Sequence, residues 1–228
     1  MNIQTNASRL PSRFIRLGTA VLAGTALSFM LGACAPVLIG GAAVGGAMVA
    51  TDRRTSGIQL EDEGIELRAG SRIRENLGDR VHVNVTSYNR QVLLTGEVPS
   101  AQDKQLVEQV VSRVENVNAV VNELGVMGNS TLTQRSSDAL VTGKVKASLV
   151  DSKDIFANSV KVTTERGTTY LMGRVTQREA DRATEITRGV AGVQRVVRVL
   201  EIISPEELQR IQTTPPASGT TSPSPRTN

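Results

Sequence analysis

Two stretches of the chain share one pattern of hydrophobic and polar positions. The first covers residues 83–111 and the second residues 160–188, and matching positions such as Gly96 and Gly173 are 77 residues apart. An internal repeat sets the unit of a fold. A unit of about 60 to 65 residues is too long for a solenoid repeat. The pattern therefore predicts two small domains in tandem.

Each unit has the order helix, strand, strand, helix, strand. In the first unit Val81, Val83 and Val85 alternate with polar residues, which is the period of a half-buried strand. A turn at residues 88–90 and a second strand over residues 91–98 complete a predicted hairpin. The equivalent turn of the second unit contains Gly167, which adopts positive φ easily.

Two helices and a third strand complete the predicted unit. In the first unit a helix runs from Pro99-Ser100 to about Arg113, and the last strand covers residues 117–126. Another amphipathic helix precedes each hairpin. Its apolar positions are Leu67, Ile73 and Leu77 in the first unit and Val141, Val145 and Leu149 in the second. The predicted class is α+β: two tandem α-β-β-α-β domains, each a three-stranded mixed sheet with two helices on one face.

Residues 1–33 are predicted to be a lipoprotein signal peptide. A basic region with three arginines precedes an apolar run of 14 residues, which is shorter than the about 20 residues that span a bilayer. It fits a cleaved signal. The following Leu-Gly-Ala-Cys run resembles a bacterial lipobox, so Cys34, the only cysteine, is the predicted lipidation site. The alternative is a free cysteine in a signal segment.

Removal of the signal lowers the formal net charge from +4 to +1. Ala35 follows the predicted lipidated cysteine, and the absence of aspartate there favours transfer to the outer membrane. The other predicted segments are a lipidated tether (34–64), a first domain (65–128), a linker (129–136), a second domain (137–203) and a disordered Pro/Ser/Thr-rich tail (204–228).

These features together resemble a known family. The order of elements, the glycine of the second strand and the Gly-Val-Gln-Arg-Val-Val run from Gly192 resemble BON domains. From about residue 50 to residue 203 the chain resembles the dual-BON outer-membrane lipoproteins. The resemblance implies a non-enzymatic protein with a palmitate-bearing anchor on the periplasmic face of the outer membrane. It also implies binding to anionic phospholipid, support of envelope integrity and a place at the cell division site.

Charge distinguishes the two units. Residues 65–128 carry a net charge of −1 and residues 138–203 a net charge of +3. Basic surfaces attract anionic lipid head groups, and an apolar patch rimmed by lysines suits such a surface. A solvated helix face is the alternative interpretation, but the resembled family binds anionic phospholipid through this helix. The predicted lipid-binding residues are Leu140, Lys144, Val145, Lys146, Val150, Ile155 and Phe156.

One position departs from the family. Members can carry tryptophan where this chain has Leu140, and tryptophan is the better anchor at a membrane interface. Ile155 and Phe156 are expected to supply replacement apolar contacts.

Other residue types form no recognisable catalytic or metal-binding motif. His82 is the only histidine and is interpreted as an exposed polar residue, which leaves neither a metal cluster nor a catalytic triad. Asp138, Asp151 and Asp154 are interpreted as solvated carboxylates. The sequence thus predicts no enzyme, cofactor, nucleic-acid partner or small-molecule substrate. A second hypothesis is a protein-interaction adaptor that docks on an envelope assembly or a cell-wall machine.

Overall fold

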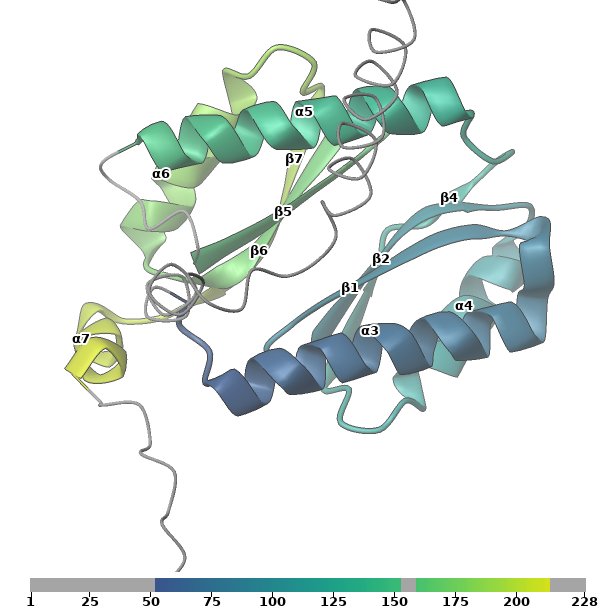
Figure 1. Ribbon diagram of the computed structural model, residues 1–228, viewed down its shortest axis with the longest axis horizontal. Helices are drawn as coiled ribbons and strands as arrows, with labels where there is room; N and C mark the ends of the chain where they lie inside the picture. Colours follow the sequence, from purple (N-terminus) through teal and green to yellow (C-terminus); the bar gives the residue numbers. More distant parts are fainter. Residues whose placement is uncertain (1–51, 153–158, 214–228) are drawn as a thin grey trace, which may run out of the picture. The chain divides into compact units, whose positions relative to one another are not determined.

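The computed structural model describes residues 52–152 and 159–213 (Figure 1). Both repeats belong to one unit of the chain, Ala47–Asn228. The described elements follow the predicted order twice, which confirms the predicted fold class.

The first repeat builds a mixed sheet from four short strands. Its elements are α3 (Ser56–Leu77), η1 (Gly78–Arg80), β1 (His82–Tyr88), β2 (Gln91–Val98), α4 (Ala101–Ser112), β3 (Ala119–Asn122) and β4 (Gly125–Val126). β1 is antiparallel to β2, while β3 and β4 both pair with β2 in parallel. The predicted third strand is interrupted because Leu124 turns into the core, where it is 2% exposed.

The second repeat has an uninterrupted three-stranded sheet. Its elements are α5 (Leu132–Asp151), β5 (Val160–Glu165), β6 (Thr168–Val175), α6 (Gln177–Arg188) and β7 (Arg195–Ile202), followed by α7 (Pro205–Thr213). The strand order is β5-β6-β7, with β5 antiparallel and β7 parallel to β6. Parallel β6 and β7 are connected through α6, as a βαβ crossover requires.

Both hairpins close through two-residue turns of positive φ. The values are 51° for Asn89 and 62° for Arg90 in the first repeat, and 48° for Arg166 and 71° for Gly167 in the second. Two successive residues of positive φ form a type I′ turn, whose twist matches that of the flanking strands. The turns therefore fix the register of each hairpin.

A buried aspartate of the preceding helix holds each turn in place. Asp62 accepts hydrogen bonds from the two turn N–H groups of its repeat at 2.8 and 2.7 Å. Asp138 does the same in the second repeat at 2.8 and 2.9 Å. The interpretation of Asp138 as a solvated carboxylate is therefore wrong, since it is 8% exposed and structural.

Each repeat has its own hydrophobic core between its helices and its sheet. In α3 the core-facing positions include Ile65, Ala69 and Ile73, spaced four residues apart. That spacing places Leu67 on the opposite side of the helix, where it is 75% exposed. The assignment of Leu67 to the core-facing stripe is therefore wrong.

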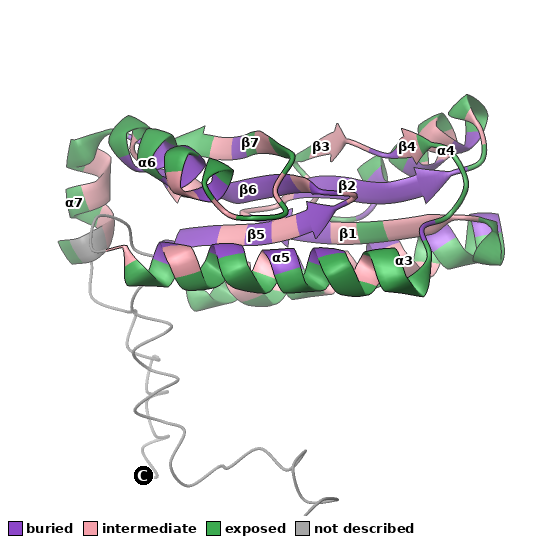
Figure 2. Ribbon diagram, turned by 90° about the horizontal axis from the view of Figure 1, so that it is seen from above, coloured by how far each residue is buried: buried purple, intermediate pink, exposed green. Residues whose placement is uncertain are grey.

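The two sheets pack against each other, with helices on the outside. Figure 1 shows α3 and α4 beyond one sheet and α5 and α6 beyond the other, and Figure 2 shows the central strands β2 and β6 as largely buried. A third apolar cluster joins Tyr88 and Leu93 of the first repeat to Tyr170, Met172 and Val199 of the second. The result is a four-layer α/β/β/α arrangement.

Two predicted segment boundaries are wrong. α3 begins at Ser56, within residues interpreted as tether, because Thr55 caps it by accepting a hydrogen bond from the Ile58 N–H. α7 lies in the predicted disordered tail. It starts with proline at its first position and glutamates in its first turn, which favour a helix start.

Candidate membrane-binding helix and the seam between the repeats

The helix α5 starts at a fully formed capping box. The Thr131 side chain accepts from the Gln134 N–H, and the Gln134 side chain accepts from the Thr131 N–H. Its buried positions are Asp138, Val141, Val145 and Leu149, so one side of the helix is fixed against the second sheet.

The structure separates the predicted lipid-binding residues of α5 into two groups. Val145 is 0% exposed in the second core, so the prediction that it contacts lipid is wrong. Leu140 is 61% exposed and Val150 is 70% exposed, and both lysines are exposed. Cys34, Asp154, Ile155 and Phe156 lie outside the described residues.

The exposed side of α5 carries large apolar residues. Besides Leu140 and Val150 it carries Leu132, which is 79% exposed, and the small residues Gly143 and Ala147. These five positions recur at intervals of three, four or eight residues and lie along one stripe opposite the core, in which the exposed Ser136 separates Leu132 from Leu140. We call them the outer stripe of α5. The helix therefore has apolar residues on two faces.

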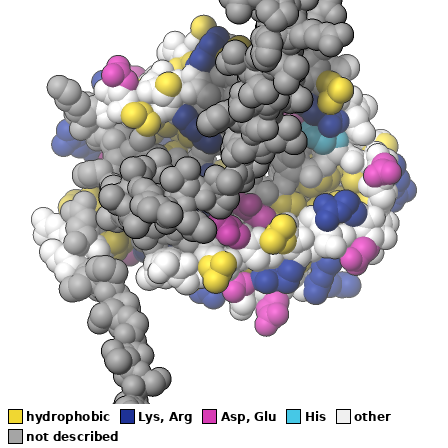
Figure 3. Space-filling model, viewed as in Figure 1, with side chains coloured by type: hydrophobic (Ala, Val, Ile, Leu, Met, Phe, Trp, Pro, Cys, Tyr) yellow, Lys and Arg dark blue, Asp and Glu magenta, His cyan; other side chains and the backbone are white. Residues whose placement is uncertain are grey.

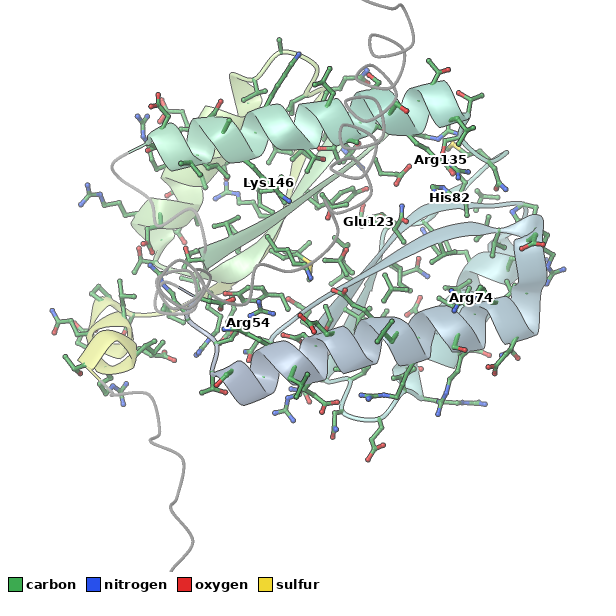
Figure 4. The ribbon with its side chains drawn as sticks, viewed as in Figure 1. Arg54, Arg74, His82, Glu123, Arg135 and Lys146 are labelled. Carbon is green, nitrogen blue, oxygen red and sulfur yellow. The ribbon has the colours of Figure 1, made fainter. Side chains whose placement is uncertain are left out.

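Lysines border the outer stripe on both sides. At 3.6 residues per turn, Lys144 falls beside Leu140 on one edge and Lys146 falls beside Val150 on the other. Figure 3 shows hydrophobic and basic side chains together over α5, and Figure 4 marks Lys146. An apolar stripe between cations is the pattern of a helix that lies in a membrane interface.

Polar side chains surround the apolar contact between the sheets, and we call the whole contact the seam. At one end Glu97, which is fully buried, accepts hydrogen bonds from Arg166 Nε, from the Ser130 N–H at 3.1 Å and from Ser130 Oγ at 3.2 Å. Its Oε2 lies 2.8 Å from His82 Nδ1. Burial acts to raise the pKa of Glu97, but the bonds from Arg166, His82 and Ser130 hold it below its ordinary value.

His82 is half-buried in this end of the seam, so its interpretation as an exposed residue is wrong. With Glu97 and Glu165 it brings three possible metal-ligand atoms within 4.8 Å of one another, a grouping that the sequence analysis missed. Both oxygens of Glu97 already accept hydrogen bonds, from Arg166, His82 and Ser130. The geometry is that of an ion-pair centre between the repeats.

Glu165 lies in a different electrostatic environment. It accepts a hydrogen bond from Asn84 Nδ2 at 2.8 Å. Burial raises its pKa, and the carboxylates of Glu97 and Asp138 add to the increase against the opposing effects of His82 and Asn84. Two carboxylates of one seam thus have pKa values shifted in opposite directions.

Two consecutive arginines hold the other end of the seam. Arg53, which is 6% exposed, donates to both carboxylate oxygens of Glu179 and to the Arg174 carbonyl. Arg54 pairs with Asp62 of the first repeat at 2.7 Å, and its guanidinium lies 4.1 Å from the centre of the Tyr88 ring. Figure 4 shows Arg54 and His82 far apart along the structure. The residues just before α3 thus bind both repeats.

Equivalent residues of the two repeats donate hydrogen bonds across the seam. Asn84 of β1 donates to Glu165 of the second repeat, and Lys161, the equivalent of Asn84, donates to the Ser87 carbonyl of the first. Residues of the two hairpin turns also cross the seam: Arg166 donates to Glu97, and Asn89 donates to Glu201. The donors are equivalent positions although their acceptors differ, and the equivalent residues Leu93 and Tyr170 both lie in the apolar cluster between the sheets. This arrangement indicates an approximate two-fold axis between the repeats.

Comparison with known proteins identifies the class. BON domains match residues 61–128 and 137–204, and these ranges cover the two repeats except for the first residues of α3 and α5. The chain belongs to the BON domain family and carries two copies of the domain.

Two relatives are similar over most of the chain. Outer membrane lipoprotein DolP of Haemophilus influenzae is 37% identical over 186 residues, covering 81% of this chain and 95% of that protein. The 21 kDa hemolysin of Actinobacillus pleuropneumoniae is 30% identical over 154 residues, covering 67% of this chain and 79% of that protein. Neither name describes an enzyme.

A solved structure of CdsD, a type III secretion protein of Chlamydia trachomatis, is more distant. It is 16% identical, with a TM-score of 0.28, and the match covers 70% of this chain and 99% of that one. A likeness of this size is too slight to inform the fold. Among the helices of the described residues, none has the length and hydropathy needed to cross a bilayer.

Proposed function

We propose that this protein is a non-enzymatic, lipid-anchored protein of the outer membrane that binds anionic phospholipid through α5 of its second BON domain. The observation that carries the proposal is the outer stripe of α5 between Lys144 and Lys146. Its largest members, Leu132, Leu140 and Val150, are each at least 61% exposed. The proposed ligand is the surface of a bilayer rich in anionic head groups like those of phosphatidylglycerol or cardiolipin.

The physical chemistry supports two joint contributions to binding. Each lysine near an anionic surface contributes about 1 kcal/mol, and inserted apolar side chains add the hydrophobic part. The predicted anchor at Cys34 keeps the protein at a membrane, and a second membrane contact makes the binding of a lipid-anchored protein more lasting. We propose that α5 supplies the further contact that selects anionic regions of the periplasmic face.

The similarity to Outer membrane lipoprotein DolP supports the proposed location. Its name assigns that relative to the outer membrane as a lipoprotein, and our proposal extends this to the present chain through the Leu-Gly-Ala-Cys run at residues 31–34. Support of envelope integrity, including at the division site, is the role that we propose for the bound protein.

Flotation with vesicles tests the proposal. A soluble chain of residues 51–228 retains the seam and both cores, which residues from Arg53 onward form. We expect it to float with vesicles that contain phosphatidylglycerol and to stay at the bottom with pure phosphatidylcholine. Binding should weaken as salt rises, because the Debye length falls to ~8 Å at physiological ionic strength. Equal flotation with both vesicle types, or none with either, contradicts the proposal and favours the adaptor hypothesis.

A further inference from the structure

The first helices of the two repeats have equivalent outer faces. The buried positions of α3 and α5 correspond at an offset of 76 residues, as in Asp62 with Asp138 and Ile65 with Val141. The same offset aligns Leu60, Gly64 and Leu67 of α3 with Ser136, Leu140 and Gly143 of α5. We call these three residues the outer stripe of α3.

The outer stripe of α3 is as exposed as that of α5. Leu60 is 71% exposed and Leu67 is 75% exposed, compared with 61% for Leu140. They are one heptad apart on the same side of α3, opposite the core positions. Two large apolar side chains therefore face solvent on one side of the helix, and the Arg68 guanidinium lies against Gly64 between them.

The approximate two-fold axis places both outer stripes toward one side of the molecule. A two-fold rotation leaves the position of a point along its axis unchanged, so equivalent faces of α3 and α5 point equally toward the same end of the axis. Figure 2 shows α3 and α5, which belong to the two outer layers, along one side of the sheets, and α4 and α6 along the opposite side. Figure 3, which looks at the side with α3 and α5, shows hydrophobic side chains over both helices.

We infer that the outer stripe of α3 is a second contact with the same anionic bilayer, so that both BON domains face the membrane together. This inference rests on the proposed function of α5. The occupant is the membrane because the stripe continues the proposed lipid interface on the same side. If the two-fold axis is perpendicular to a planar bilayer, equivalent positions of α3 and α5 lie at the same depth in that bilayer.

The two helices would contribute differently to this contact. The exposed charged side chains of α3 are Glu63, Arg72, Arg74 and Glu75, which cancel. Glu63 lies between Leu60 and Leu67 and opposes an anionic surface. The α3 stripe therefore adds apolar contact only after the lysines of α5 have brought the unit to the membrane.

Site-specific quenching tests the inference. A chain of residues 51–228 lacks Cys34, the only cysteine, so single cysteines can carry an environment-sensitive fluorophore. We would label Leu67→Cys on α3, Leu140→Cys on α5 and Gln109→Cys, an exposed position of α4. Anionic vesicles with nitroxide-bearing acyl chains should quench the probes at 67 and 140 and leave the probe at 109 unaffected.

The outcomes separate the inference from the proposed function. Quenching at 140 without quenching at 67 overturns the inference and leaves the function of α5 intact. Absence of quenching at both positions overturns both.

A second measurement needs no label. Leu60→Ser with Leu67→Ser should weaken partitioning into anionic vesicles about tenfold, equivalent to ~1.4 kcal/mol, without changing the salt dependence. The fold should remain intact, since both side chains are exposed. Glu63→Gln should tighten binding. If neither the double leucine variant nor Glu63→Gln changes the partition coefficient, α3 does not contact the membrane.

Discussion

At the scale of single residues, buried charges define how the repeats join. Glu97 and Glu165 lie in one seam, but their pKa values shift in opposite directions. Hydrogen-bond donors around Glu97 lower its pKa, whereas burial and nearby carboxylates raise the pKa of Glu165. The sequence contains a single histidine, His82, which faces Glu97 across one hairpin. The centre could not be predicted from the sequence, because Glu165 and Arg166 reach it from the other repeat. Such a charged centre can be recognised only when the positions of its partners from both repeats are known.

Opposite pKa shifts predict opposite effects of neutralisation. The ordinary pKa of both groups is 4.5. The lowered pKa of Glu97 means that its ionised form stabilises the fold above that value, and that this stability is lost as the pH falls through the lowered pKa. Glu97→Gln should cost about 1–3 kcal/mol near pH 7, with a smaller difference from wild type in acid.

Glu165→Gln should behave in the reverse way. The raised pKa of Glu165 means that its ionisation costs stability above 4.5, whereas glutamine can still accept from Asn84. This variant should be more stable than wild type near pH 7 and should match it in acid. Urea unfolding of both variants across this pH range is the measurement. Two destabilised variants near pH 7 would contradict the assignment.

At the scale of elements, α5 shows what a periodicity argument can and cannot resolve. The 3.6-residue period predicted its core positions Val141, Val145 and Leu149, which the structure confirms. The same period, applied to α3, assigned Leu67 wrongly to the core, because the sequence does not distinguish an apolar residue on an outer face from a core residue. Similarly, α7 was missed because a Pro/Ser/Thr-rich composition dominated its short helical signal.

The departure from the family at Leu140 gives a prediction for this element. Leu140→Trp places an aromatic ring on the outer stripe of α5, and tryptophan prefers the membrane–water interface. Partitioning into anionic vesicles should tighten about threefold to tenfold, and a flotation titration would measure it. Gln109→Trp on α4 serves as the control and should change nothing. Weaker binding by Leu140→Trp would argue against insertion of the stripe.

At the scale of the whole molecule, repetition predicted two domains but not their joint surface. The sequence repeat required one core for each unit, and the structure has such cores. It also has the cluster of Tyr88, Leu93, Tyr170, Met172 and Val199 between the sheets. Nothing in the hydrophobic pattern distinguished these residues from those of a domain's own core, since both faces of β2 and β6 are buried.

Residues 137–203 are predicted to fold alone with reduced stability. Their core is complete, but separation exposes Tyr170, Met172 and Val199, which the first repeat covers. The fragment should give a dispersed amide NMR spectrum and unfold at a lower urea concentration than residues 51–228. A collapsed spectrum would show instead that the repeats form one inseparable folding unit.

The predicted lipid anchor at Cys34 can be tested in the chain that carries the signal peptide. Cys34→Ala removes the thiol that would receive the lipid, so we expect an uncleaved or mislocalised precursor. Mass spectrometry of the mature N-terminus is the measurement. The wild-type chain should begin at an acylated Cys34, and an unmodified Cys34 or a start elsewhere would contradict the prediction.

Charge reversal on α5 tests the central claim most directly. Lys144→Glu with Lys146→Glu, in residues 51–228, replaces the two exposed cations beside the outer stripe. The matched control, Arg178→Glu with Arg188→Glu, makes the same change in net charge at exposed positions of α6. We predict that the lysine variant stays folded and no longer floats with phosphatidylglycerol vesicles, while the α6 variant still floats. Flotation of the lysine variant at the wild-type level would contradict lipid binding through α5.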